Sequence, residues 1–123
     1  MFRRPATAVG GGARAAELVA DGGRVFNLGG GQHHGRPDRA SGFCYFNEPA
    51  LTIGTLLDQG LERVFYLDLD AHHGDGVQDA FHDDERVFTL SIHESGRWPM
   101  ERRNLDPAQP GGILDRAGGM ARN

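Results

Sequence analysis

The strongest chemical signal in the sequence is the segment 68–76, which reads DLDAHHGDG. Side chains alternate along an extended chain, so Asp68, Asp70 and His72 are expected on one side of a strand that runs into this segment. Two carboxylates and an imidazole at a strand end suit zinc, Fe(II) or manganese. The alternative is a pair of strand-end acids and a loop histidine. We favour a metal site, because a carboxylate buried in a strand is destabilising without a partner.

A histidine pair behind a run of glycines is the second signal, in the segment 29–35 (GGGQHHG). Glycines allow the backbone to bring both rings, His33 and His34, close to a substrate. The pair could bind a metal, or one ring could act as a general base with the other as an electrostatic helper. Taken alone, two solvated loop histidines are an equally good interpretation. The acids Asp68 and Asp75 strengthen the catalytic one, because a catalytic imidazole usually needs a carboxylate to fix its tautomer.

Two further segments carry weaker signals. The segment 40–47 (ASGFCYFN) is an aromatic loop that enters a helix, and core packing explains it best. Its cysteine, Cys44, has no basic neighbour in the sequence, which favours a buried, inert thiol over a nucleophile. The segment 93–99 (HESGRWP) is ambiguous, since Trp98 could line a pocket or cover the core.

The elements that must position these residues alternate between helix and strand. The sequence predicts strands over 24–28, 63–69 and 86–92, and helices over 8–19, from the N-cap Asn47 to Gln59, and over 77–81. This order indicates an α/β fold with a parallel sheet and crossover helices, in which ligand sites lie beyond the carboxyl ends of the strands. The three predicted strands lead to His33 and His34, to Asp70 and His72, and to His93. The segment 99–123 is expected to be irregular, because it is polar, rich in Pro and Gly, and without periodicity.

Composition excludes several classes of protein. The 123 residues suffice for one small domain, and the net charge of −4 argues against a nucleic-acid-binding protein. The single cysteine excludes an intramolecular disulfide. No apolar run has the length of a membrane span, and the N-terminus MFRRP lacks the apolar core of a signal peptide. We therefore expect a cytoplasmic protein.

Both chemical segments resemble those of the histone deacetylase family. The segment 29–47 (GGGQHHGRPDRASGFCYFN) resembles its Gly-Gly-x-His-His…Ser-Gly-Phe-Cys-Tyr-x-Asn block. The segment 64–81 (VFYLDLDAHHGDGVQDAF) resembles its Asp-x-Asp-x-His-His-Gly-Asp-Gly block. The ending HESGR at 93–97 is similar to the bacterial acetoin utilization protein branch. The resemblance covers about 24–98 firmly and the flanks loosely, and it implies part of an arginase/deacetylase-type three-layer fold.

The resemblance also implies roles for individual residues in an acetyl-lysine hydrolase. Asp70 and His72 would be ligands of a zinc ion, with Fe(II) as the alternative metal. His33 and His34 would be the paired catalytic histidines, with His34 the stronger candidate for general base and acid. Asp68 would support His33, and Asp75 would support His34.

Two further sites follow from the same resemblance. Phe43 would form one wall of the acyl-lysine tunnel, and the Gly42 carbonyl would contact the substrate amide. A structural K⁺ site would be formed by the Ser91 hydroxyl and by the backbone carbonyls of Asp68, Asp70, His72 and Ile92. The implied substrate is an acetylated lysine or a small acetylated amine, without direct binding of nucleic acid or membrane.

The sequence also departs from the family pattern. Nothing matches the family's third zinc ligand or its oxyanion-stabilising tyrosine, since Asp106 and Asp115 lack the flanking pattern and Tyr45 and Tyr66 are already placed. The sequence therefore predicts an incomplete deacetylase domain over 1–123 that is weakly active or inactive. An arginase-like manganese hydrolase is one alternative, although its Asp-Ala-His-x-Asp motif has an acid two positions after the histidine and Asp75 comes three after it. A non-catalytic remnant is the other.

Overall fold

The computed structural model describes residues 2–94, 96–99 and 113–115. The elements follow the order α1 (Arg3–Val19), α2 (Glu48–Asp58), β1 (Val64–Asp68), α3 (Asp75–Ala80), β2 (Val87–His93) and β3 (Ile113–Asp115). The chain divides into two compact units, Met1–Glu62 and Arg63–Asn123, and each is considered by itself. None of the helices in the described ranges is long and apolar enough to cross a membrane.

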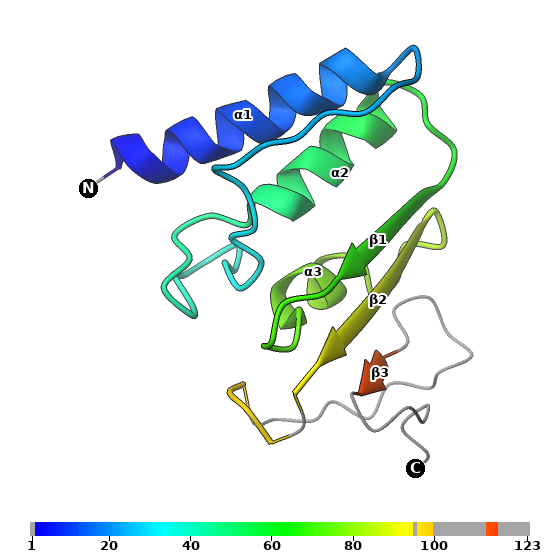
Figure 1. Cartoon of the computed structure of the whole chain (residues 1–123). Helices are drawn as coiled ribbons and strands as arrows, with labels where there is room; N and C mark the ends of the chain where they lie inside the picture. Colours follow the sequence, from blue (N-terminus) through cyan, green and yellow to red (C-terminus); the bar gives the residue numbers. More distant parts are fainter. Residues whose placement is uncertain (1, 95, 100–112, 116–123) are drawn as a thin grey trace. The chain divides into compact units, whose positions relative to one another are not determined.

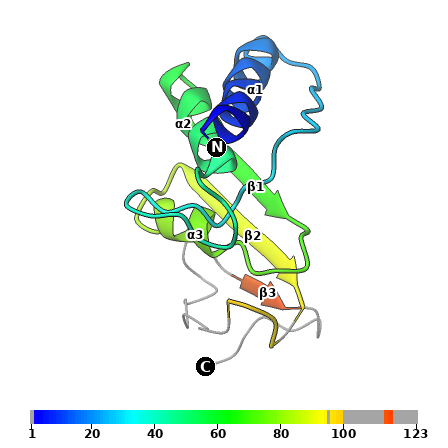
Figure 2. The same cartoon turned by 90° about the vertical axis from the view of Figure 1, so that its left-hand side faces the viewer.

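In the first unit α1 and α2 pack side by side (Figures 1 and 2). The structure extends α1 to Arg3, five residues before the predicted start at Ala8, and Pro5 lies in its first turn, where proline is tolerated. Glycine disfavours a helix interior, yet α1 contains glycine at positions 10–12, and Gly12 is buried. A Cβ atom there would lie 2.2 Å from both Glu48 Oε1 and Thr52 Oγ1 of α2. The close approach of the two helices therefore requires glycine at this position.

The helix α2 has the boundaries that its capping residues predict. The Asn47 side chain accepts a hydrogen bond from the Ala50 N–H, and Pro49 lies in the first turn. Beyond the C-terminus, Gly60 has a φ of +95°, which glycine adopts without strain. Local signals alone were sufficient for this element.

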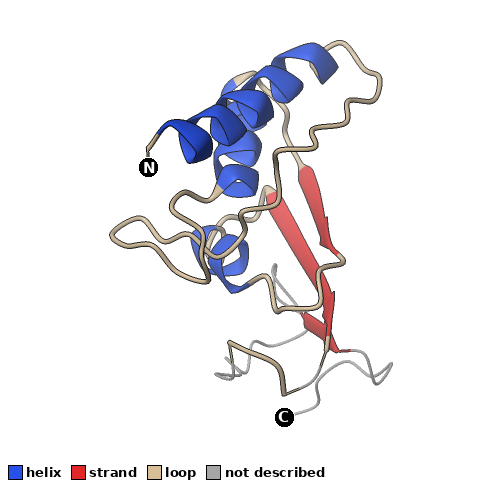
Figure 3. Ribbon diagram, turned by 60° about the vertical axis from the view of Figure 1, so that its left-hand side comes forward, coloured by secondary structure: helices blue, strands red, loops and turns tan. Residues whose placement is uncertain are grey.

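The strand predicted over 24–28 is wrong. This segment is part of the long loop between α1 and α2 (Figure 3), and Phe26 and Leu28 are largely exposed. An extended apolar segment becomes a strand only when a neighbour satisfies its backbone hydrogen bonds. Within the described residues this segment belongs to no sheet. His33 and His34 accordingly follow a loop, and the expectation that a strand leads into them fails.

The second unit is built around a parallel sheet in the order β1-β2-β3. The strands β1 and β2 pair in parallel from Val64↔Val87 to Asp68↔Ser91, with α3 in the connection, which confirms the predicted arrangement (Figure 1). The strand β3 pairs in parallel with β2 from Ser91↔Ile113 onwards. It lies inside the segment predicted to be irregular and is too short to show alternation. The other residues of 99–123, except Pro99, lie outside the described residues.

The two faces of this sheet differ in exposure. Asp68, Val87, Thr89 and Ser91 are buried on one face, whereas Phe65, Leu67, Phe88 and Ile92 on the other are exposed. The rings of Phe65 and Phe88 stack across the two strands at 5.6 Å. The buried face carries the polar residues that lead into the loop after β1.

Candidate functional site

The loop after β1, residues 69–74, is anchored by the buried carboxylate of Asp68. The Tyr66 hydroxyl donates to Asp68 Oδ2 at 2.8 Å, and the Asp70 N–H donates to Oδ1 at 3.0 Å. The chain ceases to be extended after Asp68, so the predicted alternation does not reach Asp70 and His72. Asp68 is buried with these partners, whereas the side chains of Asp70 and His72 are 53% and 38% exposed.

Asp70 and His72 form a close pair at the surface of this loop. Asp70 Oδ1 accepts a hydrogen bond from the His72 N–H at 2.7 Å and lies 2.8 Å from His72 Nδ1. Donor atoms that share a tetrahedral zinc are about 3.3 Å apart, given bonds of about 2.0–2.1 Å. The two atoms are hydrogen-bonded to each other, about 0.5 Å closer than a shared zinc ion would hold them, so a bound zinc ion would replace this hydrogen bond. Within the described residues, no group of three His, Cys, Asp or Glu side chains comes together as a metal site.

A buried polar cluster fixes the far end of the same loop. His73 Nε2 lies 2.5 Å from Gln78 Oε1 of α3, and the His73 ring stacks on His93 at 4.8 Å. The Ser91 hydroxyl lies 3.0 Å from His93 Nδ1 and accepts a hydrogen bond from the Gly74 N–H at 3.2 Å. These contacts tie the loop to α3 and to β2. The pairing of His73 with His93 was not predicted from the sequence, because the two residues belong to different elements.

Gly74 is held tightly against the Asp68 carboxylate. A Cβ atom at this position would lie 2.4 Å from Asp68 Oδ2. The register pairs Asp68 with Ser91, so two of the predicted K⁺ ligands are neighbours on adjacent strands. The K⁺ site itself stays a prediction. In the structure the Ser91 hydroxyl is hydrogen-bonded to the Gly74 N–H and lies 3.0 Å from His93 Nδ1.

In the first unit His33 and His34 are buried, each only 4% exposed. Their ring centroids are 3.9 Å apart and the ring planes are inclined by 46°. This burial excludes the interpretation of two solvated loop histidines. The loop that carries them is held in part by the buried carboxylate of Glu48, whose Oε2 accepts a hydrogen bond from the Gly31 N–H at 2.9 Å. Glu48 was not singled out from the sequence, where it is one more acid in the first turn of a helix.

A tight turn places Phe43 on the surface. Ser41 and Cys44 exchange backbone hydrogen bonds of 3.1 and 2.7 Å across Gly42 and Phe43, whose φ angles are +52° and +61°. A positive φ is strained for a bulky residue. The Phe43 side chain is nevertheless fully exposed, so no packing contact compensates for the strain. Cys44 is buried, as expected, and its thiol donates to the Gly42 carbonyl at 3.4 Å.

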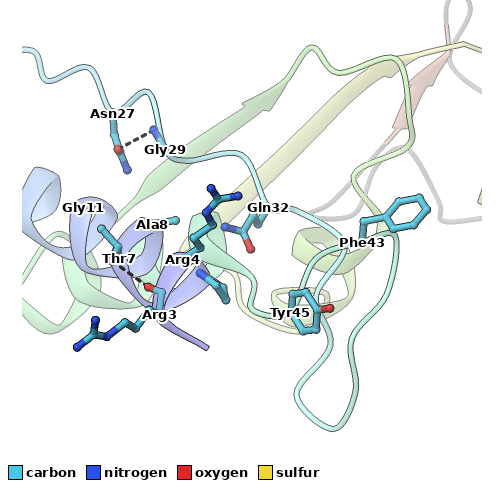
Figure 4. Close-up of a pocket in the computed structure, with 11 residues that line it drawn as sticks. Arg3, Arg4, Thr7, Ala8, Gly11, Asn27, Gly29, Gln32, Phe43 and Tyr45 are labelled. Atoms are coloured by element: carbon cyan, nitrogen blue, oxygen red, sulfur yellow. Dashed lines mark hydrogen bonds between the residues drawn. The ribbon is translucent and has the colours of Figure 1, made fainter. Parts of the chain in front are cut away.

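A pocket of about 950 Å³ lies beside this turn in the first unit (Figure 4). Phe43 and Tyr45 line it from the turn, while Arg3 and Arg4 line it from the start of α1. The pocket is therefore aromatic on one side and cationic on the other.

The predicted partnerships of His33 with Asp68 and of His34 with Asp75 join residues of different units. Asp75 is the first residue of α3 and is buried, and its N–H donates to the His73 carbonyl at 2.8 Å. The structure describes each unit by itself, so both partnerships stay predictions. The same holds for the prediction that the histidine pair faces Asp70 and His72.

Comparison with known proteins identifies the family. Residues 1–112 match the model of the histone deacetylase domain. The acetoin utilization protein AcuC of Staphylococcus aureus (strain COL) is 48% identical over 101 residues, which are 80% of this chain and 26% of that protein. AcuC of Bacillus subtilis (strain 168) is 52% identical over 92 residues, which are 73% of this chain and 24% of that protein.

Solved structures agree with the sequence relatives. A histone deacetylase homolog from Aquifex aeolicus superposes with a TM-score of 0.82 at 42% identity, over 94% of this chain and 32% of that one. A histone deacetylase homolog complexed with SAHA gives a TM-score of 0.79 at 42% identity, over 90% and 32%. The chain thus spans about a quarter to a third of the length of these relatives. It has the arginase/deacetylase type of α/β fold and belongs to the histone deacetylase family.

Proposed function

We propose that this chain contributes part of the active site of a zinc-dependent deacetylase. The substrate class is an acetylated lysine or a small acetylated amine, and the reaction is hydrolysis of the acetyl amide. The observation that carries the proposal is the pair of Asp70 and His72, whose Oδ1 and Nδ1 atoms are 2.8 Å apart on an anchored loop. The solved homolog bound to SAHA supports an acetyl-lysine-like substrate.

Asp70 and His72 would hold the zinc ion, with Fe(II) as the alternative. The chemistry that zinc supplies when bound is polarisation of the acetyl carbonyl and activation of a water molecule. Asp68 contributes by accepting a hydrogen bond from the Asp70 N–H, which fixes the backbone at Asp70. The buried cluster around His73 and Ser91 keeps the other end of the loop in place.

His34 would take the proton of the attacking water and later return a proton to the leaving amine. His33 and His34 are both removed from bulk solvent, which fits groups that work inside an active site from which water is excluded. We further propose that Asp68 supports His33 and that Asp75 supports His34.

Phe43 and Gly42 would contact the substrate. Phe43 combines backbone strain with full exposure, and strained positions without a packing role concentrate at ligand sites. An exposed aromatic wall suits the methylene chain of an acyl-lysine. The adjacent Gly42 carbonyl is an acceptor for the substrate amide N–H.

The arginase-like alternative requires a further acid close to the first metal ligands. Asp75 is the candidate, but it comes three positions after His72, whereas the arginase motif has its acid two positions after the histidine. The deacetylase is therefore favoured. With two ligands in place of the usual three, the isolated chain is expected to bind zinc weakly and to leave acetyl-lysine unhydrolysed.

Zinc titration tests the assignment of the ligands. We expect one weak site, measured by calorimetry, that is lost in the variant Asp70→Asn and in the variant His72→Ala. The control is His82→Ala, which changes a histidine beyond α3 and should leave binding unaltered. Binding that survives both substitutions in the loop, or that depends on His82, would refute the assignment.

A further inference from the structure

We infer that Asn47 is a positioning residue for the histidine pair, in addition to capping α2. Its Nδ2 donates to the backbone carbonyl of His33 and to that of Gly35, both at 3.1 Å. These two carbonyls lie on either side of His34 in the chain. The inference deepens the proposed function, because it matters for catalysis only if the histidines are catalytic.

The partners of the Asn47 amide determine its orientation. Oδ1 accepts from the Ala50 N–H at 3.0 Å, so the oxygen faces a donor while the NH₂ group faces two acceptors. The reversed amide would place oxygen against two carbonyls and NH₂ against an N–H, which is unfavourable at every contact. One side chain thus joins the first turn of α2 to the loop of the histidines.

A close backbone approach makes these hydrogen bonds possible. A Cβ atom on Gly35 would lie 2.4 Å from the Phe46 carbonyl carbon and 2.7 Å from the Asn47 nitrogen. Any other residue would push the loop away from the start of α2. Gly35 is therefore required for the carbonyls beside His34 to reach the Asn47 amide.

The next residue along the chain provides a second tether. Glu48 accepts from the Gly31 N–H through Oε2 and from the Thr52 hydroxyl through Oε1, each at 2.9 Å. Asn47 and Glu48 together hold the backbone at three positions between Gly31 and Gly35. Both imidazole rings are buried in the loop that these hydrogen bonds hold.

The substitution Asn47→Asp separates the two roles of this residue. Aspartate has nearly the same shape, caps helices as well as asparagine, and places a negative charge favourably at a helix N-terminus. It has no NH₂ group, and it sets a carboxylate oxygen against the His33 and Gly35 carbonyls. We expect α2 to remain intact while the loop of the histidines is released.

Hydrogen exchange followed by NMR on the 123-residue chain measures both roles at once. In Asn47→Asp we expect the His33 amide, which donates to the Gly31 carbonyl at 2.9 Å, to exchange at least about tenfold faster, because the loop that holds it loses its tethers at the His33 and Gly35 carbonyls. The amides of α2 should exchange as before, and the ring Cε1–Hε1 signals of the two histidines should move. The variant Gln59→Glu makes the same amide-to-carboxylate change at an exposed residue at the other end of α2, and it should alter neither loop nor rings.

Two results would overturn the inference. Equal acceleration in α2 and in the loop would mean that Asn47 acts only as a helix cap, and unchanged loop exchange would mean that it does not hold the loop. If Asn47→Asp does not fold, Asn47→Ser, which can cap but cannot reach both carbonyls, is expected to show the same selective release. These readouts do not depend on turnover. If Asn47→Asp releases the loop but zinc binding survives both Asp70→Asn and His72→Ala, the proposed function is refuted. The positioning role of Asn47 would still stand.

Discussion

The contact at Gly12 predicts opposite effects for two Gly→Ala substitutions in the same helix. Both Gly10 and Gly12 lie inside α1, where alanine is favoured over glycine by about 0.8–1.0 kcal/mol. Nothing lies within 4 Å of a Cβ on Gly10, so Gly10→Ala should raise the free energy of unfolding by about 1 kcal/mol.

At Gly12 the new methyl group would lie 2.2 Å from Glu48 Oε1 and Thr52 Oγ1. Both side chains must move, which breaks the hydrogen bond between them and weakens the hold of Glu48 on Gly31. Hydrogen bonds to a charged group contribute about 1.5–3 kcal/mol, more than the helical gain of alanine. Gly12→Ala should therefore lower the free energy of unfolding by about 0.5–2 kcal/mol.

Urea unfolding of the two variants and the parent chain tests whether the two substitutions change the free energy of unfolding in opposite directions. A change of 1 kcal/mol shifts the midpoint by roughly 0.5–1 M, so the two variants should fall on opposite sides of the parent. If Gly12→Ala raises the free energy of unfolding as much as Gly10→Ala does, the close contact between Gly12 of α1 and Glu48 is refuted. The tether between Glu48 and the loop of the histidines would then be in doubt as well.

Three further predictions concern single positions. Gly74→Ala should lower stability by about 1.5–3 kcal/mol in urea unfolding, because the methyl group displaces the Asp68 carboxylate from Tyr66; a neutral result would contradict the close contact. Phe43→Asn should raise stability by about 1 kcal/mol, since asparagine tolerates a positive φ and the exposed ring contributes no packing; a loss of stability would contradict the strain. Hydrogen bonds from the Arg86 side chain, then from its backbone, lower the pKa of Asp84 from 3.8 to about 2. The stabilisation from Asp84 is thus present above pH 4 and lost as the pH falls towards 2, so the difference in stability between the parent and Asp84→Asn should shrink over that range; a constant difference would contradict the shift.

The sequence predicted those elements whose signals are local. The cap Asn47, Pro49 and Gly60 define α2 without help from the rest of the chain, and the runs 63–69 and 86–92 are apolar enough to be strands in any sheet. The run 24–28 has the same composition, but it has no strand beside it among the described residues and remains a loop. Composition predicts the tendency of a segment to form a strand, whereas pairing depends on its neighbours.

The candidate site was predicted in the same uneven way. Residue types and spacing identified Asp70 and His72, and the pair is close in space. The partner of Asp68 could have been found, because alternation places Tyr66 on the same side of β1. The tethers that hold the loop of His33 and His34 could not be predicted, because Asn47 and Glu48 belong to a different element, the start of α2. The close packing of Gly12 on α2 could not be predicted either, because a glycine inside a helix ordinarily only disfavours that helix.

The most direct test of the proposed function is a chimeric deacetylase. The third of the Aquifex aeolicus histone deacetylase homolog that matches this chain would be replaced by the 123 residues, and hydrolysis of a fluorogenic acetyl-lysine peptide would be measured beside the parent homolog. We predict that the chimera hydrolyses the peptide and that His34→Ala or Asp70→Asn in the inserted segment abolishes turnover. A chimera that is folded by circular dichroism but inactive beside an active parent, or one that keeps its turnover in both variants, would contradict the proposal.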